Sequence, residues 1–247
     1  MTALRIAPHV HSTWSYDGRW ALEELARAFA RRGYAAVLLA EHDRSFDAGH
    51  WAAYREACAA ASGHGAVLVP GIEYSDAENR VHVPVWGAEP FLGRGRPTAD
   101  LLADARAAGG VAVLAHPARR DAWRALAPEA MALLDGVEVW NRKYDGWAPS
   151  AVALELSRRY ELPPFVGLDF HTARQFFPLA LSGSGEGPAD VETVLAALRA
   201  GALESTAFSG PAERFAHGPA RSAARTGELA RRTLARAVRQ ARAAART

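Results

Sequence analysis

Two histidines near the N-terminus are separated by a single residue, in the segment His9-Val10-His11. On a strand, side chains at positions i and i+2 point to the same side, so these two imidazoles can bind one ion. Such a pair is common, and alone it does not distinguish a metal site from two ordinary polar histidines. Further side chains of the types that bind metals follow along the chain, at Asp17, His42, Glu73, His82, His116, Asp169 and His171.

Imidazole and carboxylate ligands together favour Mn, Fe or Zn over Mg or Ca. These side chains are too many for one ion, so we expect two or three divalent ions. Paired ions can hold a phosphoryl oxygen, activate a water molecule and stabilise a leaving oxygen, so no protein nucleophile is required. The sequence has no Gly-x-Ser-x-Gly motif and a single cysteine, Cys58. We interpret Ser12 and Ser15 as turn residues or as supports for the ligands.

Short apolar runs alternate with helix-like stretches along most of the chain. The runs are residues 4–7, 35–40, 66–72, 81–86, 111–115, 136–140 and 164–168, and the helix-like stretches are 20–32, 50–61, 98–108, 122–134, 149–160 and 188–200. Strand followed by helix, repeated six or seven times, predicts a parallel barrel or a doubly wound sheet. The candidate ligands follow nearly every run, which favours the barrel, because all its strand ends meet at one face.

Seven segments of the chain, over residues 4–175, resemble in order the signatures of the polymerase and histidinol phosphatase (PHP) family. They contain His9 to Gly18, Glu41-His42-Asp43, Gly71-Ile72-Glu73, Val81-His82-Val83, Ala115-His116-Pro117, Gly136 to Asn141, and Gly167-Leu168-Asp169-Phe170-His171. The resemblance implies a distorted seven-stranded (β/α) barrel, similar to a TIM barrel, with a trinuclear site and phosphoesterase activity. It assigns His9, His11, Glu73 and Asp169 to one metal, Glu73 as a bridge with His82 and His116 to a second, and Asp17, His42 and His171 to a third.

Two positions depart from the family pattern. Glu41 stands where many members have aspartate, and the last signature reads Gly-Leu-Asp-Phe-His where Gly-Ser-Asp-Ala-His is usual. Neither change removes a ligand. The metal site is therefore still expected, but the substrate of a particular subfamily is not implied.

Cationic and amide side chains that follow the ligand motifs are candidates for binding phosphate oxygens, which match the planar fork of arginine. We prefer Arg44 and Arg174, and the remaining candidates are Arg19, Arg119, Asn141 and Lys143. In so arginine-rich a chain, any one arginine is more often a solvated or ion-paired surface residue. Glu138 either orients a ligand histidine or contacts substrate, and a buried carboxylate paired with an arginine is an equal alternative.

The composition is that of one globular domain, with 247 residues, 49% of them hydrophobic, and a formal net charge of +2. One cysteine allows no internal disulfide, and no segment approaches the roughly 18 apolar residues of a membrane span, so we expect a cytoplasmic protein. Residues 1–217 would form the barrel. Residues 218–247 would form a basic helix packed on it or extending from it.

The expected C-terminal helix is rich in arginine, since residues 212–247 contain nine Arg and two Glu. Its larger apolar residues, Leu229, Leu234 and Val238, form a thin stripe, which predicts weak packing on the barrel and no part in the site. A basic platform for an acidic partner or for nucleic acid is the alternative.

Our first hypothesis for function is hydrolysis of a small phosphomonoester by a metal-bound hydroxide, with Glu73, His116 and Asp169 at the catalytic centre. The second is a phosphodiesterase or exonuclease acting on nucleotides or short single strands. Only 52 residues separate His116 from Asp169, which leaves little room for a substrate-capping insertion, so nucleic acid is possible but not favoured. The third is a noncatalytic, metal-stabilised module that binds a partner. The sequence does not determine the oligomeric state.

Overall fold

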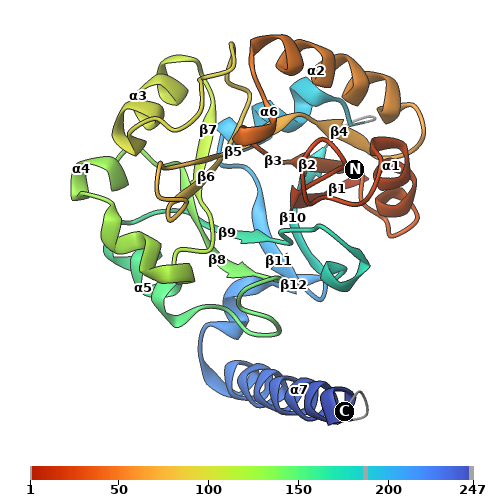
Figure 1. The fold of residues 1–247 in the computed structure, drawn as a ribbon, viewed down its shortest axis with the longest axis vertical. Coiled ribbons are helices and arrows are strands. Elements are labelled where there is room, and N and C mark those ends of the chain that lie inside the picture. The colour runs from red at the N-terminus through yellow and green to blue at the C-terminus, as the bar shows by residue number, and fades with distance from the viewer. Residues whose placement is uncertain (1, 186–188, 245–247) are drawn as a thin grey trace.

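The computed structural model describes residues 2–185 and 189–244, and its strands form two six-stranded sheets surrounded by helices (Figure 1). The first sheet contains, in spatial order, β12 (Gly210–Pro211), β11 (Glu204–Ala207), β10 (Leu179–Gly185), β1 (Thr2–Val10), β2 (Ala36–Leu39) and β4 (Val67–Val69). The second contains β3 (Glu41–His42), β5 (Gly71–Ser75), β6 (His82–Trp86), β7 (Val111–Leu114), β8 (Gly136–Asn141) and β9 (Pro164–Gly167). The mixed α/β class predicted from the sequence is confirmed.

The two sheets are joined where the chain passes directly from one to the other. Only Ala40 separates β2 from β3, and only Pro70 separates β4 from β5. At the other side of the second sheet, the segment after β9 pairs with the end of β1 through a parallel bridge between Val10 and Phe170. The backbone N–H of His11 donates to the carbonyl oxygen of Phe170 at 2.9 Å. The ends of β1, β3 and β9 are therefore fixed close together by main-chain hydrogen bonds.

Strand β6 runs antiparallel to both of its neighbours, β5 and β7. The alternation of apolar runs and helix-like stretches predicted parallel strands throughout, and this expectation is wrong for β6. Residues 76–81 form a tight turn between β5 and β6, whereas a parallel connection needs a crossover of a dozen or more residues. Asp76 stabilises this turn, since its carboxylate accepts the N–H groups of Arg80 at 2.6 Å and Val81 at 3.2 Å.

Most of the predicted helices are present. The α-helices are α1 (Leu22–Ala30), α2 (Ala48–Ser62), α3 (Thr98–Ala107), α4 (Pro128–Met131), α5 (Ala151–Arg159), α6 (Val191–Arg199) and α7 (Gly218–Ala244). Short 3₁₀ helices cover Asp43–Ser45, Arg119–Ala125, Ala173–Gln175 and Ala212–Phe215. Side chains at the N-caps of α2, α5 and α6 accept a backbone N–H, as is typical of Asp and Ser there. Pro188, the first residue of the predicted stretch 188–200, lies outside the described residues.

The predicted helix over residues 122–134 is wrong in its extent. The chain forms a 3₁₀ helix there and then only the short helix α4, which starts at Pro128. Proline has no backbone N–H and forces the preceding residue away from helical geometry, and Ala127 is accordingly extended (φ −69°, ψ 152°). The proline thus divides the stretch into two short elements.

Strands β10 and β11 were not predicted. They extend the first sheet beyond β1 in antiparallel order. The segment Leu179–Gly185 reads Leu-Ala-Leu-Ser-Gly-Ser-Gly, and its glycine and serine content is typical of a loop. Tertiary pairing with β1 stabilises the extended conformation in spite of this composition.

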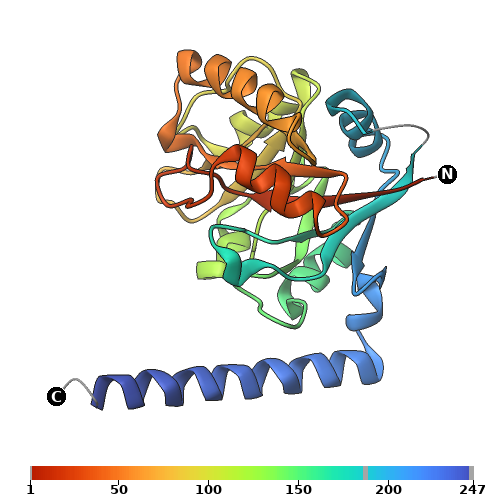
Figure 2. The same cartoon turned by 90° about the vertical axis from the view of Figure 1, so that its right-hand side faces the viewer.

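The C-terminal helix α7 lies apart from the helices that surround the sheets and extends as a long rod beside them, as Figure 2 shows. Its predicted apolar stripe does not pack on the rest of the chain, because Leu229 and Leu234 are 68% and 67% exposed. The contact is made instead by other residues of the helix, among them Gly227, which lies against the ring of Trp147, and Glu228, which accepts the backbone N–H of Trp147. No helix in the described part of the chain is long and apolar enough to cross a membrane.

We expect Gly71→Ala to lower the free energy of unfolding by about 1–3 kcal/mol, the usual effect of overpacking a core. An added Cβ at Gly71 would lie 2.4 Å from the carbonyl oxygen of Leu39 and 2.3 Å from Cδ1 of Trp86, where the two sheets meet. Gly49→Ala in α2 is the matched control, because its Cβ makes only an ordinary contact at 3.4 Å. Urea denaturation followed by circular dichroism tests this, and equal stabilities of the two variants would contradict it.

Candidate metal centre

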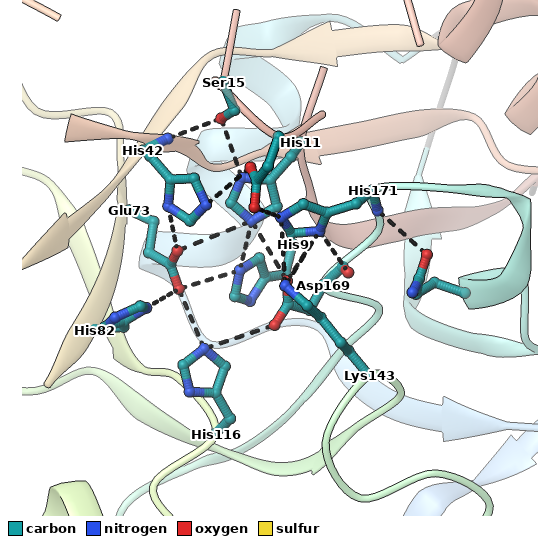
Figure 3. A network of polar contacts seen from close by, with 12 residues as sticks. His9, His11, Ser15, His42, Glu73, His82, His116, Lys143, Asp169 and His171 are labelled. Atoms are coloured by element: carbon teal, nitrogen blue, oxygen red, sulfur yellow. Dashed lines mark hydrogen bonds and ion pairs between the residues drawn. The ribbon is translucent and has the colours of Figure 1, made fainter. Parts of the chain in front are cut away.

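The predicted ligands come together at one end of the sheets, although they come from six separate parts of the chain (Figure 3). Each follows or occupies a strand: His9 and His11 lie at the end of β1, His42 on β3, Glu73 on β5, His82 at the start of β6, His116 after β7, and Asp169 and His171 after β9. Because β6 is antiparallel, it is the start of this strand, and not its end, that reaches the cluster.

The Glu73 carboxylate is at the centre of the cluster and is only 1% exposed. Five histidines surround it: Oε1 is 3.0 Å from His82 Nδ1 and 3.3 Å from both His9 Nε2 and His116 Nε2, while Oε2 is 3.0 Å from His42 Nδ1 and 3.9 Å from His11 Nε2. Burial alone would raise the pKa of Glu73, but the surrounding imidazoles outweigh it and hold this pKa well below its usual value. Glu73 is therefore an ionised carboxylate in a buried position.

Asp169 and Asp17 connect the remaining histidines. Asp169 Oδ1 lies 3.6 Å from His11 Nε2 and 3.2 Å from His171 Nδ1. The two carboxylate oxygens of Asp17 lie 3.3 Å from His42 Nε2 and 3.1 Å from His171 Nε2. Burial opposes the ionisation of both aspartates, yet Lys143 and the histidines around Asp169, and hydrogen bonds from His171 and His42 to Asp17, lower both pKa values.

Three groups of side chains place their ligand atoms close enough together to hold a cation. In each group these atoms lie within 4.8 Å of one another, and the groups are His9, His11 and Asp169; His9, Glu73 and His116; and His11, His42 and His171. All these residues are buried, so a cation among them would be largely removed from water. The donor set of imidazole nitrogens and carboxylate oxygens fits a divalent transition metal or zinc.

Three of these residues have a strained backbone. His9, His116 and Asp169 have φ angles of +59°, +28° and +46°, a region that side chains other than glycine rarely adopt. Such strain persists only where the surrounding structure fixes it, and it is frequent at functional sites. Here it turns the side chains at the ends of β1, β7 and β9 toward the common centre.

The pKa values of the histidines indicate which ring nitrogens carry protons that a bound cation would displace. Burial lowers the pKa of both His11 and His116, which leaves a ring nitrogen lone pair available. For His42, burial acts in the same direction, but hydrogen bonds with Asp17 and Glu73 outweigh it and raise the pKa to about 10. For His9, burial would also lower the pKa, but the nearby carboxylate of Glu138 outweighs it and the pKa is raised. A divalent cation takes the place of such protons, so binding should release them.

Glu138 supports two of the histidines, which is one of the interpretations left open by the sequence. Its carboxylate accepts His9 Nδ1–H at 2.6 Å, the backbone N–H of His116 at 3.0 Å and an amide hydrogen of Asn141 at 2.7 Å. Gly167 makes room for it, since an added Cβ there would lie 2.0 Å from Glu138 Oε1. An acceptor at Nδ1 fixes the tautomer and ring orientation of His9, so that Nε2 faces the cluster.

Ser15 and Glu41 form a second support behind the cluster. Glu41 is fully buried and accepts the hydroxyl of Ser15 at 2.6 Å and the backbone N–H of Ser12 at 2.9 Å. Ser15 Oγ also accepts the backbone N–H of His42 at 2.9 Å and lies 3.2 Å from His11 Nδ1. The glutamate that departs from the family pattern is thus satisfied by hydrogen bonds and lies behind the ligands.

Lys143 and Arg119 are the predicted cationic residues that contact the cluster. Lys143 Nζ lies 3.1 Å from Asp169 Oδ1 and 3.3 Å from His171 Nε2. Arg119 contacts His82 Nε2 at 3.2 Å. Burial would lower the pKa of Lys143, but Asp169 outweighs it and raises this pKa. Lys143 is therefore a charged amine at the edge of the cluster.

The other predicted substrate residues lie farther out. Arg44 is exposed and lines a separate surface hollow with Asp47. Arg19 and Arg174 are exposed, and no hydrogen bond or ion pair connects their side chains to the cluster within residues 2–185 and 189–244. Asn141 is buried, and its side chain is occupied by Glu138 and by neighbouring backbone N–H groups. The two arginines preferred from the sequence are thus not the cations nearest the cluster.

Comparison with solved structures shows proteins of similar fold. A protein of Bifidobacterium adolescentis assigned as a metal-dependent phosphoesterase aligns with a TM-score of 0.50 and 20% identity, over 78% of this chain and 96% of that one. PsfC of Pseudomonas syringae aligns with a TM-score of 0.59 and 15% identity, over 79% and 89% of the two chains. The lesion-specific endonuclease PfuEndoQ of Pyrococcus furiosus gives 0.55 and 13%, over 84% of this chain and 60% of its own.

The chain shares its fold with these three proteins. A scan of the sequence against models of known protein families finds no match, and a search of curated protein sequences finds none either.

Two tyrosines at the cluster were not singled out from the sequence. The ring of Tyr16 stacks on His42 with centroids 5.0 Å apart, and the ring of Tyr144 lies 4.6 Å from that of His116. Both are partly exposed, at 68% and 37%. Their positions in the sequence could have indicated them, because Tyr16 directly precedes Asp17 and Tyr144 directly follows Lys143. The cluster is thus buried on its strand side and open to solvent beside these rings.

We expect Glu138→Gln to weaken binding of a divalent cation by about 10- to 100-fold, the usual effect of removing a partner that orients a ligand histidine. The amide keeps the size of the side chain but removes the charge that faces His9 Nδ1. Competition with a chromophoric chelator measures the affinity. Glu155→Gln in α5, where the carboxylate is 59% exposed, is the control, and equal affinities of the two variants would contradict the supporting role of Glu138.

Proposed function

We propose that this chain is a metal-dependent phosphoesterase of the PHP type, which hydrolyses a small phosphomonoester with two or three divalent ions of Mn, Fe or Zn. The observation that carries the proposal is the buried Glu73 carboxylate within reach of five imidazoles, with Lys143 at the exposed edge of the same cluster. The similarity of fold to a protein assigned as a metal-dependent phosphoesterase supports it.

The proposed ligands are those that the resemblance to the PHP family assigns, and the geometry supports this division in outline. Asp17 contacts both His42 and His171, and Glu73 lies between His42 and His82 as a bridge would. The grouping of ligand atoms differs from the assigned division at two residues, since His9 also groups with Glu73 and His116, and His11 with His42 and His171. In this proposal the two sheets, joined through Val10 and Phe170, form a distorted barrel over residues 1–217, and the remaining part, residues 218–247, contains the extending helix α7.

Bound divalent ions would supply positive charge for the phosphoryl oxygens and would make a water molecule more acidic. The protein's own groups complete the site. Lys143 and Arg119 lie at its edge, where their N–H groups can donate to phosphate oxygens that face away from the ligands. Tyr16 and Tyr144 flank the open side, where their rings can contact the group that enters. Glu73, His116 and Asp169 hold the centre of the site.

Two common nucleophilic residues, Ser15 and Cys58, are not available for attack. The hydroxyl of Ser15 donates to Glu41 and accepts from the backbone of His42. Cys58 is buried in α2, and burial raises the pKa of its thiol, which disfavours the reactive thiolate. Attack by water is therefore the route that this arrangement favours.

We expect the protein to hydrolyse a generic aryl phosphate, to lose this activity with a chelator and to regain it with Mn or Zn. Glu73→Gln should reduce turnover by about 100-fold or more, because the charge between the ions is lost. Elemental analysis of the wild type should find more than one equivalent of metal per chain. The control is Glu204→Gln on β11, and a near-normal rate for Glu73→Gln would remove Glu73 from the centre of the site.

A second candidate function is cleavage of phosphodiesters in nucleic acid. The observation that favours it is helix α7, whose exposed arginines, such as Arg225 and Arg236, form a basic surface beside the rest of the chain. The fold is also similar to that of a lesion-specific endonuclease, of which one solved complex contains a 27-mer duplex with an abasic lesion.

Salt dependence separates the two candidates, because arginines that contact a nucleic-acid backbone release counterions on binding. We expect Arg225→Gln/Arg236→Gln to hydrolyse an aryl phosphate at the wild-type rate and to show no selective loss on a short oligonucleotide. The comparison uses both substrates, from low to moderate salt. A loss confined to the oligonucleotide, with a salt slope reduced by about one for each lost phosphate contact, would favour the diesterase instead.

A further inference from the structure

Glu228 is a buried carboxylate on helix α7, most of whose larger side chains are exposed. Its side chain is 8% exposed, whereas Leu229 beside it is 68% exposed. A carboxylate is rarely buried unless it has partners, since its desolvation is costly. The partners of Glu228 therefore identify what α7 contacts.

One partner is the backbone of the loop formed by residues 142–147, directly after β8, which we call the site loop. Glu228 Oε2 accepts the N–H of Trp147 at 3.0 Å. The carboxylate also lies directly against Gly146, where φ is +76° and an added Cβ would be 2.3 Å from Oε2. Only glycine fits both this conformation and this approach.

The other partners are two arginines of α7 itself. Arg231 donates to both carboxylate oxygens at 2.7 Å, and Arg232 Nε donates to Oε1 at 2.6 Å. Burial opposes ionisation of Glu228, but these hydrogen bonds and that from Trp147 outweigh it and hold the pKa at about 2. The group is thus a charged acceptor near neutral pH, and its hydrogen bond to the loop is of the stronger, charge-assisted kind.

The site loop carries two groups that reach the metal cluster. Its Lys143 lies 3.1 Å from Asp169 Oδ1, and the ring of its Tyr144 lies 4.6 Å from that of His116. The loop is tied at its start, where Asn141 Oδ1 accepts the N–H of Lys143 at 3.0 Å. At its far end, the loop is connected to helix α7 by the hydrogen bond from the N–H of Trp147 to Glu228.

We propose that Glu228 is a positioning residue, through which helix α7 holds the site loop so that Lys143 and Tyr144 face the metal cluster. The inference rests on the proposed phosphoesterase function for its effect on substrate, but the contact itself does not depend on that function. It differs from the expectation drawn from the sequence, in which the helix takes no part in the site. Loosening the loop should weaken binding of the phosphate group and leave the metal ligands in place.

The test compares Glu228→Ala and Glu228→Gln with Glu213→Ala, an exposed carboxylate just before α7. With an aryl phosphate, Glu228→Ala should raise KM about tenfold with kcat changed by less than about threefold, and metal content should be unchanged. Glu228→Gln keeps an acceptor for the N–H of Trp147 but loses the charge, so its effect should be smaller. The Glu228→Gln variant also tests the proposal if the alanine variant does not fold. Glu213→Ala should match the wild type.

A double-mutant cycle with Lys143→Met shows whether Glu228 acts through the site loop. If it does, Glu228→Ala should change KM by less than about twofold in the Lys143→Met background, because the group that it positions is already absent. Full additivity of the two substitutions would overturn the proposal.

Hydrogen exchange of the peptide that contains residues 142–147 gives a readout independent of hydrolysis. We expect faster exchange in Glu228→Ala than in the wild type or Glu213→Ala, with the metal loaded and no substrate present. If the protein hydrolyses no phosphate ester, the proposed function fails while this measurement still decides the contact. Unchanged exchange, or faster exchange with an unchanged KM for a phosphate that is hydrolysed, would overturn the positioning role.

Discussion

The burial of the Glu73 carboxylate among imidazoles is the interaction on which the rest of the site depends. A charge in this position is unfavourable unless opposite charge surrounds it, and five histidines do so at 3.0 to 3.9 Å. Those histidines compete for the same carboxylate oxygens. A divalent cation would therefore be favoured over protons at this position, since one cation could bind several of these side chains at once.

The precision of the cluster comes from the main chain. The ends of β1 and β9 are tied by hydrogen bonds between His11 and Phe170, and the strained φ angles of His9 and Asp169 are possible because those bonds fix both strands. The groups that would meet a substrate are held differently. Lys143 and Tyr144 lie on a loop whose conformation depends on side chains, including one from the distant helix α7. Strands tied by main-chain hydrogen bonds thus hold the candidate ligands, and a loop held by side-chain hydrogen bonds faces the open side.

Much of this could be predicted from the sequence, because spacing and residue type carry the information. His9 and His11 are two apart on a strand, and His116 and Asp169 follow apolar runs, so their convergence follows from strand ends that share one face. The antiparallel direction of β6 was missed, although the runs 66–72 and 81–86 are only eight residues apart, which is too short for the crossover that a parallel pair needs. The choice among arginines also failed, because adjacency to a motif does not determine where a long side chain points.

The contact of Glu228 with the site loop could not be predicted from the sequence for another reason. It lies 85 residues from Lys143, and in a run of arginines a single glutamate is typical of a helix with i, i+3 and i, i+4 ion pairs. Those pairs are present, with Arg231 and Arg232. Nothing in the local pattern indicates that the same carboxylate also accepts from Trp147, because that contact depends on how the helix lies against a glycine-containing loop.

Because β6 is antiparallel, the turn that leads into this strand lies at the edge of the candidate site. Where strands are parallel, the segments that lead into them are on the opposite face, but the turn of residues 76–81 leads directly to His82 on the ligand side. This turn closes on itself through Asp76. Asn79 Oδ1 in the turn accepts from His82 Nε2, and Arg119 donates to the backbone carbonyl oxygen of Asn79. Exposed turns of this kind accommodate added residues without disturbing the strands that they join. A longer hairpin at this position would therefore add side chains beside His82, with every candidate ligand and every strand–helix connection left as it is.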